Sequence, residues 1–139
     1  MNRPRLVRLV AALGIVGGAL SACTQNEDPP ETATVVVEAG ATTQLQLIVS
    51  TRFSVPTSGE LVLVNADTIL VAGNYNEVFS LNEEARFTAR LAYLGDGEES
   101  ARLAVLIDDR REYDQDAVMA PGGFLQYVYR FQQDVGIIF

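Results

Sequence analysis

Hydrophobic and polar residues alternate along several stretches of this chain. In residues 86–93 the apolar side chains Phe87, Ala89 and Leu91 take every second position, and Arg90 falls between the last two. Successive side chains of a β-strand point to opposite faces, so this pattern predicts a strand with one buried face. The same period of two recurs in residues 44–50, 101–107 and 125–131.

Three shorter runs are uniformly apolar and rich in β-branched residues: 35–37, 61–64 and 69–71. Such runs, bounded by turn residues, are typical of strands that are buried on both faces, and we expect central strands here. The dipeptide Asp96-Gly97 lies between two alternating stretches. Asp-Gly favours a tight turn, so the sequence predicts a hairpin that pairs the two flanking strands.

Eight or nine short strands separated by turn residues predict an all-β fold, an antiparallel β-sandwich over residues 34–139. The architecture is expected to be immunoglobulin-like only in the packing of two sheets, because the cysteine pair and tryptophan of antibody domains are absent from the sequence. Val135, Ile137 and Phe139 continue the alternation. They predict a last strand that closes an edge of the sandwich.

Residues 1–22 have the layout of a secretory signal peptide. Arg3, Arg5 and Arg8 come first, without an acidic residue, and residues 9–20 form an unbroken run of apolar residues and glycine. The run is shorter than the roughly 20 apolar residues that a membrane-spanning helix needs. A positive start, a short apolar region and small residues before a cleavage point together predict export.

The sequence Leu20-Ser21-Ala22-Cys23 resembles the lipobox of bacterial lipoproteins. The resemblance implies cleavage between Ala22 and Cys23, a diacylglyceryl group on the Cys23 sulfur, and a protein anchored in the membrane of the cell envelope. Thr24 in place of an aspartate resembles the outer-membrane sorting pattern of hosts with two membranes. Two or more acyl chains anchor stably where one binds only marginally.

Lipidated Cys23 and the residues that follow it, through Ala33, are predicted to form a flexible acidic linker. The segment is polar and contains Pro29 and Pro30, and it has too little apolar surface to order itself. Ten extended residues span at most about 33–36 Å, so the domain is expected to stand close to the lipid surface.

Removing the signal peptide makes the protein strongly acidic. Three of the ten arginines are lost, while all 18 carboxylates remain, and the chain contains no lysine or histidine. A domain of this charge is expected to repel nucleic acids and anionic lipid surfaces, and to favour cationic partners or metal ions.

We expect no enzymatic activity. Without histidine or lysine, the Ser-His-Asp, Cys-His and Ser-Lys arrangements and Schiff-base chemistry are excluded. The sequence contains neither a G-x-S-x-G elbow nor a phosphate-binding glycine motif. Paired carboxylates remain as the only acid–base groups, and most of them fall in predicted turns.

The densest acidic segment, residues 108–116, is the one candidate metal site. Its carboxylates are Asp108, Asp109, Glu112, Asp114 and Asp116. Closely spaced oxygen ligands suit calcium, but the glycine and terminal glutamate of an EF-hand loop are absent, and two arginines compete for the carboxylates. The alternative, which we favour, is a solvated turn with internal ion pairs. No other cofactor is expected.

The sequence thus predicts a lipid-anchored envelope β-sandwich that acts as a binding, scaffold or accessory module. Its expected partners are the membrane, through Cys23, and another envelope protein or a glycan. The alternative function is a calcium-dependent domain that binds polysaccharide or protein. Tyr127 and Tyr129 are predicted to pack in the core, although a stacking surface for a glycan or peptide was the second possibility.

Overall fold

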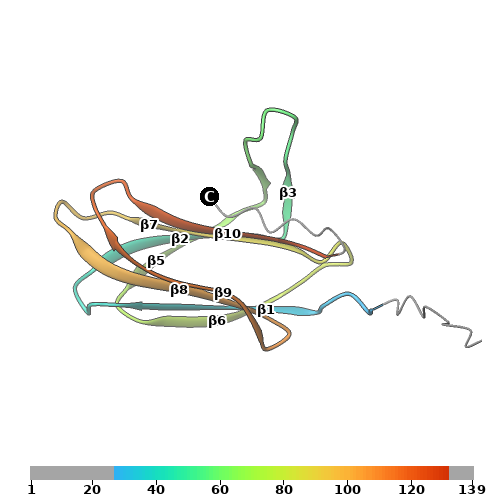
Figure 1. Ribbon diagram of the computed structural model, residues 1–139, viewed down its shortest axis with the longest axis horizontal. Coiled ribbons are helices and arrows are strands. Elements are labelled where there is room, and N and C mark those ends of the chain that lie inside the picture. Colours follow the sequence, from blue (N-terminus) through green and yellow to red (C-terminus); the bar gives the residue numbers. More distant parts are fainter. Residues whose placement is uncertain (1–26, 132–139) are drawn as a thin grey trace, which may run out of the picture.

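The computed structural model describes residues 27–131, and this part of the chain consists of ten β-strands without a helix (Figure 1). The predicted all-β fold is confirmed. The strands are β1 (Thr32–Ala39), β2 (Gln44–Ser50), β3 (Arg52–Ser54), β4 (Val62–Val64), β5 (Asp67–Ala72), β6 (Tyr75–Ser80), β7 (Arg86–Tyr93), β8 (Glu99–Ile107), β9 (Arg110–Met119) and β10 (Phe124–Arg130).

Eight strands form two antiparallel sheets that face each other as a sandwich (Figure 1). We call the sheet with the order β6-β1-β8-β9 sheet A, and the sheet with the order β10-β7-β2-β5 sheet B. The remaining strands, β3 and β4, form a separate hairpin that stands out on the side of sheet B. In an immunoglobulin domain the first two strands share a sheet, whereas β1 and β2 lie in different sheets here.

The core lies between the two sheets and follows the predicted alternation. Leu91 of β7 and Val105 of β8 have no exposed surface, while Arg90 is exposed, which confirms the inward faces predicted for these two strands. Tyr127 belongs to the same apolar cluster, as predicted, and Tyr129 packs against it. The largest fully buried apolar side chains are Phe87, Leu45, Leu47, Leu91, Leu103, Ile107, Val35, Val37 and Val105.

The predicted hairpin at Asp96-Gly97 is wrong, because β7 and β8 lie in different sheets. The segment between them crosses from sheet B to sheet A, a separation of about 10 Å in a sandwich. Gly95 fits this crossing because a Cβ there would collide with the Tyr93 hydroxyl oxygen. The Asp-Gly dipeptide marks a change of direction, but it does not specify that the flanking strands pair.

Two of the three apolar runs are not central strands. The run at residues 35–37 lies in β1, inside sheet A, as predicted. The run at 61–64 lies in the β3–β4 hairpin, and the run at 69–71 lies in β5, at the edge of sheet B among the described strands. A short apolar run has no period, so it cannot distinguish an edge strand from a central one.

The first strand begins at Thr32, two residues earlier than the sequence suggested. Ala33, which we had assigned to the linker, has no exposed surface. The Leu81 N–H donates a hydrogen bond to the Glu31 carbonyl at 2.8 Å, so even the residue before the strand is paired. The predicted last strand, with Val135, Ile137 and Phe139, lies outside the described residues.

Candidate functional site

The expected turn covers only the first two residues of the acidic segment, and the rest of the segment belongs to β9. The expected internal ion pairs are present, between Arg110 and Glu112 and between Arg111 and Asp114. Asp108 and Asp109 form the turn between β8 and β9, both with positive φ, at 45° and 64°. Asp108 Oδ1 accepts hydrogen bonds from the backbone N–H groups of Glu31 and Thr32, each at 3.0 Å. The Thr32 backbone N–H is the main cause that lowers the pKa of Asp108. Asp108 therefore fastens the start of β1 to this end of the sandwich.

Asp114 lies on the outer face of sheet A between two arginines. Its carboxylate accepts hydrogen bonds from Arg102 Nε at 2.6 Å and Arg102 Nη2 at 2.7 Å, and from Arg111 Nη1 at 2.6 Å. The Arg102 hydrogen bonds lower the pKa of Asp114 to about 2. Arg102 also contacts Glu38 of β1 at 3.0 Å, and hydrogen bonds to Asp114 and Glu38 raise its pKa. The arginines occupy the oxygens that a calcium ion would need.

The other carboxylates of the segment are separated from Asp114. The register shift between Val105 and Leu106 leaves Glu112 as an extra residue of β9, and Glu112 pairs with Arg110 at 2.7 Å. Asp109 and Asp116 are exposed. Within residues 27–131, no three carboxylate, histidine or cysteine side chains are grouped so that they could hold a metal ion. The described geometry thus supplies no observation in favour of calcium at this segment.

The outer face of sheet B has a different character, because it exposes large apolar side chains on both edge strands. Phe124 of β10 pairs with Ala92 of β7, Ala92 pairs with Gln46 of β2, and Gln46 pairs with Leu70 of β5. Residues that are directly opposite in a sheet point to the same face, so these four side chains form a row across sheet B. Leu70 is 75 % exposed, and Phe124 is 46 % exposed.

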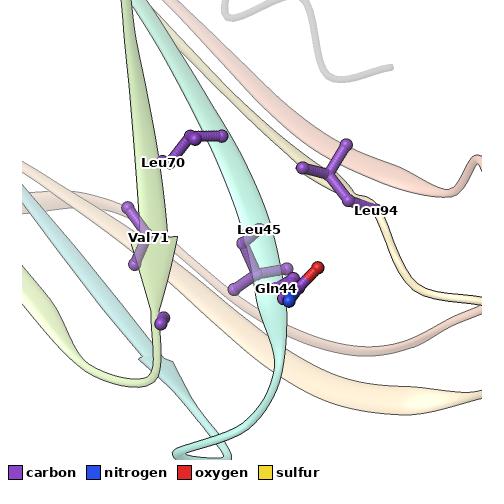
Figure 2. Close-up of a pocket in the computed structure, with 6 residues that line it drawn as sticks. Gln44, Leu45, Leu70, Val71 and Leu94 are labelled. Atoms are coloured by element: carbon purple, nitrogen blue, oxygen red, sulfur yellow. The ribbon is translucent and has the colours of Figure 1, made fainter.

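A shallow pocket of about 270 Å³ opens at one end of this row, next to Leu94 (Figure 2). Leu70 of β5 and Leu94, the residue that follows β7, lie on either side of β2, with Gln44 between them. The Leu94 N–H donates to the Gln44 carbonyl at 3.0 Å, which holds this residue beside β2. The pocket is lined by Gln44, Leu45, Leu70, Val71, Ala72 and Leu94.

The β3–β4 hairpin adds to the same side of the molecule. Phe53 turns toward the sandwich and is 4 % exposed, and its carbonyl accepts a hydrogen bond from Arg86 Nη1 at 3.2 Å. Val62 and Val64 are about half exposed. We call this side of the molecule the B face, and it comprises the row across sheet B, Leu94 and these two valines.

Charge is distributed unevenly between the two sheets. The strands of sheet B contain a single carboxylate, Asp67. The strands of sheet A contain six, namely Glu38, Glu77, Glu99, Glu112, Asp114 and Asp116. Four of the seven arginines in residues 27–131 lie on sheet B or the hairpin, at positions 52, 86, 90 and 130. One of them, Arg90, stacks over the Phe124 ring at 4.1 Å.

Of the two tyrosines that could have formed a stacking surface, Tyr127 belongs to the interior and Tyr129 is partly buried against it. Tyr127 is 7 % exposed and stacks on Tyr113 of β9, with ring centroids 5.1 Å apart. Burial is the main cause that raises the pKa of Tyr127 to about 12. The Tyr113 and Tyr127 rings pack between the facing edges of the two sheets, so they do not form an exposed stacking surface.

The sequence alone did not identify the B face, because its residues come from four strands and a hairpin. The only signal was indirect: Phe124 falls at a position opposite to the inward residues of its strand. The lipidation residue Cys23 and the cleavage residue Ala22 lie outside the described residues.

No family model, curated protein or solved structure matches the chain. No helix long and apolar enough to cross a membrane occurs within residues 27–131.

Proposed function

We propose that this protein is an exported lipoprotein, held in the membrane by acyl chains on Cys23, whose β-sandwich acts as a non-catalytic binding or accessory module of the cell envelope. The signal layout and the lipobox resemblance of residues 1–23 support the anchor. The exposed apolar side chains of the B face support the binding function.

The observation that favours binding is the distribution of exposed apolar side chains. Large hydrophobic residues that are at least about half exposed number seven in the described part of the chain, and five of them belong to the B face. The other two, Val78 and Val118, are single residues on sheet A. Isolated exposed hydrophobics are ordinary on protein surfaces, whereas a group of them marks an interaction site.

The test is photo-crosslinking in native membranes from residue 70 or residue 118. Leu70 and Val118 are both exposed apolar residues on edge strands, at 75 % and 67 %, but they lie on opposite sheets. We expect the probe at residue 70 to give a discrete adduct with an envelope component and the probe at residue 118 to give none. Equal labelling at both positions, or no adduct at residue 70, would reject the B face as the contact surface.

A further inference from the structure

We propose that the B face rests on the anionic lipid surface to which the protein is tethered, and that the acidic sheet A faces away from it. The inference depends on the proposed lipid anchor, and it names the component that the B face contacts. It also revises the expectation that so acidic a domain must repel an anionic membrane, because that expectation treated the charge as evenly distributed.

The first support is the charge of the face that would meet the lipid. Arg90 is exposed on sheet B, and the strands around it contain no carboxylate except Asp67, at the start of β5. The hairpin adds Arg52 and one acid, Glu60. Arginine side chains near an anionic surface each strengthen association about fivefold. Arg86, at the start of β7, is paired with Glu84 at 3.5 Å, so this support rests on Arg90.

The second support is the distance between the lipid and the carboxylates of sheet A. Packed sheets lie about 10 Å apart, and the outward side chains of sheet A are farther still from the B face. The screening length at physiological ionic strength is about 8 Å. Glu38, Asp114 and Asp116, which point outward from sheet A around Arg102, are thus largely screened from a membrane beneath sheet B.

The third support is the chemistry of the exposed side chains. Leu70, Leu94 and Phe124 offer apolar surface at one end of the B face, and the hairpin valines offer it at the other. Arg90 stacks on the Phe124 ring and so presents a cation beside an aromatic group. An apolar body with a charged tip suits the boundary between acyl chains and headgroups.

The fourth support is the reach of the tether. Eight residues lie between Cys23 and the first residue of β1, Thr32, and the nine residue-to-residue steps span at most about 30–32 Å. β1 belongs to sheet A, so the tether has to pass only the thickness of the sandwich when the B face lies on the lipid. So short a tether keeps the domain at high effective concentration near the surface, and weak contacts then suffice.

The test uses the full lipidated protein in vesicles, with one fluorophore on either Leu70→Cys or Val118→Cys. The chain has one cysteine, whose sulfur the proposed lipid occupies, so each variant has a single reactive thiol. A quencher attached to the lipid headgroups reports which side of the sandwich meets the membrane. In vesicles with anionic lipid, we expect strong quenching at residue 70 and weak quenching at residue 118. Arg90→Gln should shift the orientation equilibrium about fivefold away from contact.

Equal quenching at the two positions would overturn the inference and leave the anchor intact. A second outcome would also overturn it. If the fluorophore at residue 70 were shielded from solvent without anionic lipid, and if this shielding rose with protein density, a second copy of the protein would be covering the B face. Flotation with the vesicles is measured on the same samples. A protein that does not float and has no acyl group would overturn the anchor itself, and the orientation with it.

Discussion

At the scale of single residues, the acidic segment is organised by hydrogen bonds and arginines. Asp108 holds the start of β1, and Asp114 is shared by Arg102 and Arg111. Carboxylates that are close in sequence therefore serve different neighbours in space. From the sequence, all five acids of this segment formed one candidate site, because a sequence shows the spacing of residues along the chain and not the partner of each side chain.

Asp108→Ala should loosen the start of β1. The substitution removes the acceptor of the Glu31 and Thr32 backbone N–H groups, and we expect a loss of roughly 1 kcal/mol and faster amide exchange at these residues. Asp109→Ala is the matched control, since Asp109 also has positive φ and is exposed. Equal exchange in the two variants would mean that the Asp108 contact does not hold the strand.

The same contact predicts a direction with pH. The pKa of Asp108 is lowered in the folded protein, so its contribution is fully present above the pH at which a free aspartate titrates, about 3.9. It is lost as the pH falls through the lower pKa of the folded state. The protection factor of the Thr32 amide, which is the exchange rate corrected for its intrinsic pH dependence, should therefore fall in acid in the wild type and stay unchanged in Asp108→Ala.

Calcium is expected to leave the melting temperature unchanged relative to sodium at equal ionic strength. Arg102 and Arg111 already bind the Asp114 carboxylate. A calcium ion would have to displace both arginines, and their positive charges would repel it. Thermal unfolding in both salts measures the difference. A rise specific to calcium that disappears in Asp114→Asn/Asp116→Asn would instead establish the metal site.

At the scale of elements, alternation identified the strands and their inward faces. Leu91→Ala should lower the free energy of unfolding by about 2–5 kcal/mol, because Leu91 is fully buried between the sheets. Arg90→Ala, one residue away, should cost at most about 1 kcal/mol, including its stacking on Phe124. Chemical denaturation measures both variants, and similar losses would show that the inward face of β7 is misassigned.

The pairing of the strands could not be obtained in the same way. Period two shows which side of a strand is buried, but both β7 and β8 satisfy it while lying in different sheets. The apolar run of β5 suggested a central strand, although β5 is an edge strand that exposes Leu70. The B face consequently emerges only when β10, β7, β2 and β5 are placed side by side.

At the scale of the whole molecule, the two sheets have different surfaces. Sheet A concentrates the carboxylates and their arginine partners, while the B face combines exposed apolar side chains with Arg90. A net charge describes neither surface, and the proposed contact with lipid depends on the B face alone. This difference between the two sheets is what the proposed tethered domain would use at a membrane.

The most direct test of this account is the fate of the protein when its anchor is removed. We expect wild-type protein to incorporate an acyl label and to stay in the membrane fraction at high salt. Cys23→Ser should incorporate no label and be released, because the B face without acyl chains provides only weak association. A Cys23→Ser protein that keeps the label and remains with the membrane at high salt would contradict the account.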